Sequence, residues 1–214
     1  MMRLLFTSLL SIFLCINVLC QESDFQTWTC FSLTKKINKK NNIYIKQGLR
    51  FRENSSILSK SFLDIKLRFK YNKRWFYSFG YRDSKDWNKE LQKESKNRYY
   101  LDVLYTSKKL NRFNINVRNR YQYQGSSALA YNSSLRQKIS LSYNIRRTKM
   151  DPEISVEHFL QENMIINKLR YTLGFSYPIN KDLDLDLRYR IQQEINVANS
   201  ETLFIFEGKL SYDL

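Results

Sequence analysis

Residues 204–214 read Phe-Ile-Phe-Glu-Gly-Lys-Leu-Ser-Tyr-Asp-Leu and decide the fold that we expect for this chain. The even-numbered positions carry Phe, Gly, Leu or Tyr, whereas the odd-numbered positions from Glu207 onward are polar. Successive side chains of a β-strand point to opposite faces, so this stretch predicts a strand with one apolar, aromatic face and one polar face. We expect the even positions to face lipid in a membrane β-barrel.

This strand also resembles the terminal assembly signal of bacterial outer-membrane proteins, because it alternates, carries aromatic residues and runs to the last residue of the sequence. That signal usually ends in Phe, whereas this sequence ends in Leu214. The resemblance implies that the barrel-assembly machinery acts on the chain during biogenesis. We expect the strand to pair with the region Trp28–Leu33, which would remove the free edges of the sheet.

Nine further segments show the same alternation over about ten positions each. A soluble sandwich also alternates, so the uniform segment length is what favours a membrane barrel: a tilted strand of ~9–11 residues crosses a bilayer. Aromatic residues at the segment ends suit the two membrane interfaces. The segments are 43–52, 61–71, 75–82, 98–106, 113–124, 135–143, 153–160, 169–177 and 183–191.

Short turns that contain Asn separate alternate pairs of segments, at 37–39, 71–73, 110–112, 143–144 and 179–181. Asn tolerates the left-handed conformation that a tight turn needs. The other connections are generally longer and polar, at 52–61, 83–97, 124–133, 161–167 and 192–202. Short periplasmic turns and longer extracellular loops are typical of outer-membrane barrels.

The expected fold is all-β, a single antiparallel transmembrane β-barrel of about 12 strands, within a range of 10–12. Ten alternating segments are clear, and the region Trp28–Leu33 adds an eleventh of mixed parity. Bacterial single-chain barrels have even strand numbers. Either the N-terminal region is a plug on ten strands, or it is kinked and contains a twelfth strand.

The beginning of the chain resembles a secretory signal peptide, with Arg3 followed by the largely apolar stretch Leu4–Leu19. This stretch is shorter than the ~20 residues of a membrane-spanning helix. We expect cleavage after Cys20, which removes residues 1–20 and leaves 21–214 as the outer-membrane barrel. The alternative is lipidation of Cys20, for which Leu19 is an unfavourable neighbour because a small residue is usual there.

Cleavage would leave Cys30 alone among the three cysteines, which excludes an internal disulfide and a thiol pair for a metal. The formal net charge of +16 would ordinarily suggest a nucleic-acid partner, but an export signal argues against one. The 15 Tyr and 14 Phe residues indicate strands and interfacial girdles instead. We therefore expect the outer membrane of a Gram-negative bacterium as the location and its lipid as the main partner.

Three short motifs resemble a known family: Asp-Phe-Gln-Thr-Trp at 24–28, Lys-Lys-Ile-Asn-Lys at 35–39 and Gln-Gly-Leu-Arg-Phe at 47–51. They are similar to domain-of-unknown-function family 2490, predicted bacterial outer-membrane β-barrels. The resemblance covers nearly the whole chain after the signal. It implies a barrel and carries no activity, cofactor or functional residues.

The polar parity of the strands is expected to line the lumen, and it is mainly basic. A basic wall raises the local concentration of anions and could select small anionic solutes. Alternatively, cross-strand ion pairs could fill a narrow barrel and leave no pore. The basic candidates are Arg50, Arg52, Arg68, Arg118, Arg120, Arg136, Arg170, Arg188 and Arg190, and the acidic candidates are Asp64, Glu153, Glu157, Asp184 and Asp186.

His158 is the one His and, on strict parity, faces lipid, as the catalytic His of outer-membrane phospholipase does. Ser155, Ser176 and Asn163 are candidate partners, but no nucleophile motif surrounds it, and a catalytic triad is recognised by geometry. Asp-Leu-Asp-Leu-Asp at 182–186 resembles half of a calcium loop, yet the required Gly and terminal acid are absent. We expect no cofactor and no metal.

The leading interpretation is a non-enzymatic, porin-like outer-membrane barrel, either structural or a narrow anion-favouring solute channel. The alternatives are a lipid-acting barrel enzyme that uses His158, and a surface-binding barrel that acts through extracellular loops such as 83–97.

Overall fold

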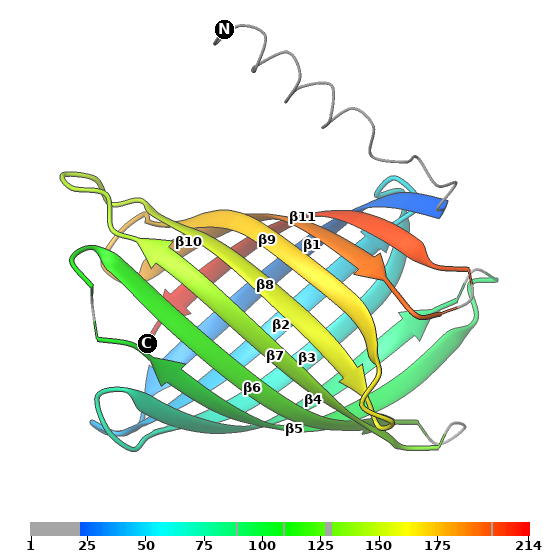
Figure 1. Ribbon diagram of the computed structural model, residues 1–214, viewed down its shortest axis with the longest axis horizontal. Helices are drawn as coiled ribbons and strands as arrows, with labels where there is room; N and C mark the ends of the chain where they lie inside the picture. Colours follow the sequence, from blue (N-terminus) through cyan, green and yellow to red (C-terminus); the bar gives the residue numbers. More distant parts are fainter. Residues whose placement is uncertain (1–21, 89, 109, 127–129, 198) are drawn as a thin grey trace, which may run out of the picture.

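The computed structural model describes residues 22–214 except 89, 109, 127–129 and 198 (Figure 1). The described residues contain eleven strands and no helix. The strands are β1 (Glu22–Lys36), β2 (Asn41–Arg52), β3 (Ile57–Lys70), β4 (Trp75–Trp87), β5 (Lys93–Thr106), β6 (Phe113–Gly125), β7 (Asn132–Tyr143), β8 (Asp151–Gln161), β9 (Ile166–Pro178), β10 (Leu183–Glu194) and β11 (Glu201–Asp213). They form one closed barrel in sequence order, which confirms the all-β barrel.

No helix within the described part of the chain is both long and apolar enough to cross a membrane. Each strand pairs in antiparallel fashion with its neighbours in sequence, whereas β1 and β11 close the barrel as a parallel pair. An odd number of up-and-down strands brings the first and last strands together in the same direction. Eleven lies within the expected range of 10–12 strands, but the preferred number of twelve and the wholly antiparallel sheet are wrong.

The N-terminal strand β1 is one continuous ladder of 15 residues, neither a plug nor a kinked pair of strands. Its register with β11 places Trp28 beside Glu207 and Phe31 beside Leu210. The expected pairing of the terminal strand with the region Trp28–Leu33 is confirmed. Trp28 points inward and is only 5% exposed, and this inward indole is what made the parity of β1 look mixed.

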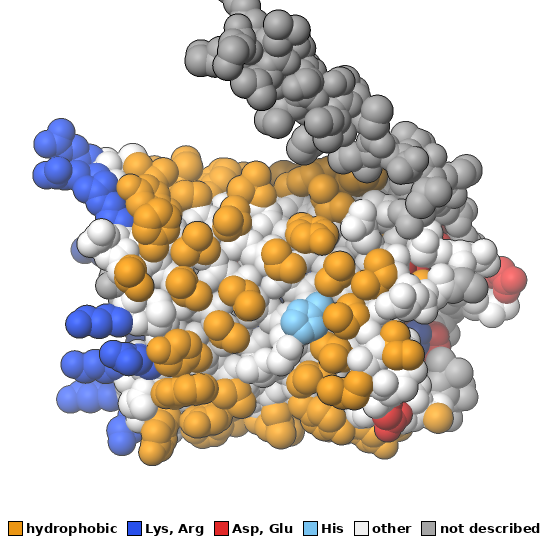
Figure 2. Space-filling view, in the orientation of Figure 1, with side chains coloured by type: hydrophobic (Ala, Val, Ile, Leu, Met, Phe, Trp, Pro, Cys, Tyr) orange, Lys and Arg blue, Asp and Glu red, His pale blue; other side chains and the backbone are white. Residues whose placement is uncertain are grey.

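The two faces of β11 follow the predicted alternation. Ile205 and Glu207 are buried inside the barrel, whereas Phe206, Leu210 and Tyr212 are exposed on its outer surface. Figure 2 shows the same arrangement on the face in view, where apolar side chains cover much of the barrel wall and Lys and Arg side chains gather at one end.

The Asn turns lie at the end of the barrel where β11 finishes, which we call the C-terminal end (Figure 1). Asn38, Asn72 and Asn180 each accept backbone N–H bonds from residues two and three positions later through Oδ1. Only Asn111 of the five repeats has positive φ, at 55°. The recurrent Asn therefore acts mainly through its side-chain oxygen, as in an Asx-turn, and not through left-handed backbone as expected.

Connections at the opposite end, the N-terminal end, are not longer than these turns. They cover 53–56, 88–92, 126–131, 162–165 and 195–200, against 37–40, 71–74, 107–112, 144–150 and 179–182 at the C-terminal end. The expected asymmetry is absent because strand pairing continues beyond the apolar segments. Most of the stretch 83–97, for example, is the paired end of the β4–β5 hairpin, where Trp87 lies beside Lys93.

The parallel seam between β1 and β11 predicts which positions can be cross-linked. In a background with the natural cysteines replaced by Ser, Phe31→Cys with Leu210→Cys should form a disulfide, because these outward-facing residues are Cα partners. Phe31→Cys with Phe206→Cys is the matched control, since its partner lies four residues, about 13 Å, further along β11. Mobility on non-reducing gels measures the bond, and cross-linking of the control alone would contradict this register.

Candidate functional site

The interior of the barrel contains a cavity of about 860 Å³ lined by residues from all eleven strands. Seventeen of the lining residues are Lys or Arg, and five are Asp or Glu. The cavity extends from Asn88 and Asn167 near the N-terminal end to Tyr44 and Arg68 near the C-terminal end. The interior is therefore neither completely filled nor electrically balanced along its wall.

Most of the predicted lumen residues line this cavity. These are Arg50, Arg68, Arg118, Arg120, Arg136, Arg170, Arg188, Arg190, Asp64 and Glu157. The remaining four lie outside its lining. Arg52 donates to the Asn88 carbonyl at the N-terminal end, Glu153 pairs with Lys138, Asp186 is buried against Lys209, and Asp184 is exposed near the C-terminal end.

Sequence reasoning missed two groups of lining residues. One comprises charged residues on strand extensions past the apolar alternation, such as Lys60, Asp86 and Lys96. The other comprises inward aromatic residues, such as Trp28 and Phe159. Extending the alternation of each strand past its apolar segment could have located the first group. The second group could not be located in this way, because a large aromatic residue on the polar face breaks the alternation.

Glu157 on β8 is the centre of the ion-pair network on one wall. Its Oε1 accepts from Arg118 at 2.5 Å and from Arg136 at 2.8 Å, and its Oε2 lies 3.3 Å from Arg170. The carboxylate is 3% exposed, so three guanidiniums from β6, β7 and β9 share one buried negative charge. This wall remains positively charged even though each of its Arg side chains has a carboxylate partner.

On the opposite wall, Asp64 accepts from Arg82 Nε at 2.8 Å and from the Tyr100 hydroxyl at 2.7 Å. Asp102 forms a bidentate pair with Arg120, at 2.6 and 2.7 Å. Gly80 faces the Tyr100 ring, and a Cβ at this position would overlap the ring atoms. Gly80 therefore lets the Tyr100 ring lie against the wall and reach Asp64.

Aromatic rings support the guanidiniums inside the barrel. Arg50 lies 3.7 Å from the Trp28 ring centroid, Arg120 3.8 Å from Tyr100, and Arg82 4.1 Å from Phe62. A guanidinium over an aromatic face is attracted by the ring quadrupole, and more strongly when water is excluded. Arg120 and Arg82 also have carboxylate partners, whereas Arg50 is held by the Trp28 ring without one.

The cations without a carboxylate partner lie together on one side. Within the described residues, no ion pair joins Lys46, Arg50, Lys66, Arg68 or Arg98 to an acid. All five come from β2, β3 and β5. Arg98 instead donates through Nε to Gln124 at 2.6 Å, and Lys66 lies over the Tyr44 ring at 4.3 Å.

His158 lies on the outer surface among apolar side chains (Figure 2). Its Nε2 is 2.7 Å from Oε1 of Gln137, and its cross-strand neighbours are Gln137 and Leu169. Of its proposed partners, Ser155 is buried on the opposite face of β8, and Ser176 bonds to the inward Asp186. The structure thus brings no proposed nucleophile to this His.

The aspartates at 182–186 do not form a common site either. Asp186 points inward to Lys209 at 2.9 Å, whereas Asp182 belongs to the turn between β9 and β10. Throughout the part of the chain that the structure describes, no group of three or more His, Cys, Asp or Glu side chains could hold a metal ion.

Comparison with known proteins gives one family. A family model described as "Protein of unknown function (DUF2490)" matches residues 25–202. The chain belongs to this family. The family resemblance of the sequence motifs is thereby confirmed, and the closed barrel is the structure of this DUF2490 chain. No curated protein matches the chain.

The Glu157 network predicts a large effect of a small change. Glu157→Gln should lower the free energy of unfolding by about 3–5 kcal/mol, because it leaves three buried guanidiniums without their shared carboxylate. Urea unfolding in detergent micelles, followed by tryptophan fluorescence, measures the change. Glu162→Gln, at an exposed position between β8 and β9, is the matched control and should change stability by less than about 0.5 kcal/mol. Equal effects of the two substitutions would contradict the central role of Glu157.

Proposed function

We propose that the protein is a non-enzymatic bacterial outer-membrane barrel that forms a narrow, anion-favouring passage. The observation that carries this proposal is the combination of an apolar outer wall with a cavity of seventeen cations and five carboxylates. An irregular or open sheet cannot reside in a bilayer, whereas a closed barrel pairs its backbone groups internally.

The outer wall supports the membrane location. Its middle exposes large apolar residues on successive strands, among them Phe79, Leu101, Tyr121, Ile139 and Leu173, each between 47% and 59% exposed. Monomeric soluble proteins rarely expose a contiguous apolar surface of this kind. Hydrocarbon chains of lipid would cover it without further cost.

Two aromatic girdles bound this apolar wall. Trp75 packs on Tyr105, with ring centroids 4.9 Å apart, towards the C-terminal end, and Tyr81 packs on Tyr99, at 5.2 Å, towards the N-terminal end. Further pairs follow, Phe113 with Tyr143 and Tyr123 with Tyr131. Phe113 and Tyr123 lie ten residues apart on β6, which corresponds to about 25 Å along the axis of a tilted barrel and matches a bilayer core.

The proposal that the barrel lies in the outer membrane, and not in another membrane, rests on the sequence alone. The expected signal peptide, residues 1–20, lies outside the described residues, as does Cys20. An exported chain that forms a barrel would be inserted by the assembly machinery of a Gram-negative outer membrane. Because connection lengths at the two ends are similar, they do not indicate which end faces the periplasm.

The charge of the cavity supports anions as the favoured solutes. A low-dielectric wall concentrates the field of the cations that line it and raises the local concentration of small anions. A lumen closed by ion pairs is the structural alternative. The remaining space of about 860 Å³ and the five unpaired cations on β2, β3 and β5 favour a passage.

The two other candidate functions have less support. A lipid-acting enzyme would need a nucleophile beside His158, and its cross-strand neighbours are Gln137 and Leu169. A surface-binding role for 83–97 would need a long projecting loop, and this stretch is mainly the paired β4–β5 hairpin.

In planar bilayers, the purified protein should give an anion-selective current whose selectivity falls in 1 M salt, where charges are screened beyond about 3 Å. Modification of Cys30 tests whether this current passes through the lumen, because the Cys30 side chain lines the cavity. An anionic methanethiosulfonate should modify Cys30 faster than a cationic one, after each rate is normalised to a free thiol. The modification should reduce the current.

Cys30→Ser is the control, and its current should be insensitive to the reagent. A reversal potential that shows no anion preference, or a Cys30 thiol that reacts more slowly with the anionic reagent, would contradict the proposal. Absence of any conductance step above background would contradict the passage and leave a structural role for the barrel.

A further inference from the structure

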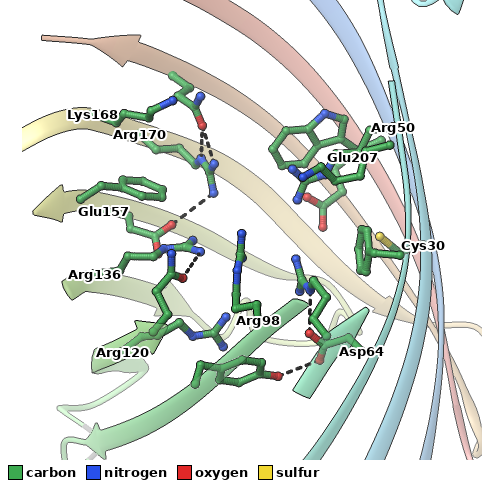
Figure 3. A pocket seen from close by; sticks show the side chains of 18 of the residues that line it. Cys30, Arg50, Asp64, Arg98, Arg120, Arg136, Glu157, Lys168, Arg170 and Glu207 are labelled. Atoms are coloured by element: carbon green, nitrogen blue, oxygen red, sulfur yellow. Dashed lines mark hydrogen bonds and ion pairs between the residues drawn. The ribbon is translucent and has the colours of Figure 1, made fainter. Parts of the chain in front are cut away.

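The indole of Trp28 is surrounded by three guanidiniums from different strands. Arg50 of β2 lies 3.7 Å from its ring centroid, Arg170 of β9 5.3 Å and Arg190 of β10 5.7 Å. Figure 3 shows Arg50 and Glu207 on one side of the cavity, facing Arg170 and Glu157 on the other. We call Trp28, Arg50, Arg170 and Arg190 the Trp28 cluster.

Carboxylates balance this cluster only in part. Glu207 pairs with Arg190 at 2.5 Å, and Glu157 reaches Arg170 at 3.3 Å while it is shared with two other arginines. Arg50 has no carboxylate partner among the described residues. The cluster therefore retains positive charge within the cavity.

Two donors of the cluster also lack an acceptor. The Nε–H groups of Arg50 and Arg190 are buried and have no hydrogen-bond partner within the described part of the chain. A buried donor without an acceptor is unfavourable, so an oxyanion that enters the cavity can accept from both groups without displacing a protein partner. Both belong to guanidiniums beside the same indole, and the cavity they line has room for a small ligand.

We propose that the Trp28 cluster binds a phosphate group, either inorganic phosphate or the phosphate of a small organic solute. Guanidiniums recognise oxyanions through paired N–H donors in a planar fork. A tetrahedral phosphate presents oxygens in four directions and carries more negative charge than a monocarboxylate, so it matches guanidiniums that approach from three strands and a cavity with surplus positive charge. This inference rests on the anion-favouring lumen and names the anionic group that the lumen would retain.

Trp28 is itself a reporter for this site. The chain has three Trp residues, and Trp75→Phe with Trp87→Phe leaves Trp28 alone. Titration of this variant, folded in detergent micelles, with inorganic phosphate at constant ionic strength should give a saturable change in Trp28 emission. Acetate should give no such change in the same concentration range. Glycerol phosphate is titrated in the same way: tighter binding than that of inorganic phosphate indicates an organic phosphate, and weaker binding indicates the free ion.

Arg50→Gln in this background should weaken phosphate binding at least tenfold. Arg50 is the suitable position because its removal leaves no carboxylate without its partner. Arg68→Gln is the matched control, since Arg68 also lines the cavity, has a buried Nε without an acceptor, and lies over Tyr44 instead, at 5.0 Å. It should change binding less than twofold.

Arg50→Lys keeps the charge but removes the fork, so its affinity should fall between those of the parent and Arg50→Gln. It replaces Arg50→Gln if that variant does not show the heat-modifiable gel migration of a folded barrel. A non-saturable response, a response that acetate reproduces, or equal weakening by Arg68→Gln would overturn the phosphate site. An anion-selective current with no saturable Trp28 response would overturn this inference alone and leave the proposed passage in place.

Discussion

Closure of the sheet between β1 and β11 is the constraint on which the rest of the structure depends. Once the ladder is closed, every strand has one face directed to the interior, and a single residue of slip would exchange the two faces. With eleven strands, closure requires a parallel pair, and its register aligns Trp28 with Glu207 on the inner face and Phe31 with Leu210 on the outer face. The terminal strand therefore has a structural role beyond its alternating composition. It determines the parity of β1, and thereby brings an indole into the centre of the charged interior.

The interior combines two ways of holding buried cations. One wall uses mainly carboxylates, with Glu157 shared by three arginines, and the other also holds cations on aromatic faces, with Arg50 on Trp28 and Lys66 on Tyr44. Both are effective where water is restricted, but only the first neutralises charge. The surplus of positive charge is the physical basis for the anion-favouring passage that we propose, and it would be smaller if the inward aromatic positions carried acids.

Much of the fold could be predicted from the sequence because the alternation of β2 to β11 is regular apart from inward aromatic residues such as Phe159, and the parity of Phe206, Leu210 and Tyr212 is as expected. The strand number could not, because Trp28 on an inner face gave β1 a mixed parity, and the even strand numbers of bacterial barrels favoured ten or twelve over eleven. The connections are shorter than expected because the strands extend past the alternating segments. Lys60 and Trp87, for example, lie outside those segments in the sequence, yet both are paired in the sheet. The basic lining residues followed from parity, whereas the division into carboxylate-paired and unpaired cations depends on which strands lie opposite one another. That information is not present in a local pattern.

In the proposed membrane barrel, the outer parity of the strands faces lipid and the inner parity faces an aqueous, basic interior. An apolar diazirine dissolved in the lipid of reconstituted vesicles, activated by light and mapped by mass spectrometry, tests it most directly. Labelling should fall on outward residues such as Phe79, Leu101 and Tyr121, and should spare their inward neighbours Ser78, Tyr100 and Arg120. Labelling distributed equally over the two parities, or absent from the outer wall, would contradict an outer wall that faces lipid.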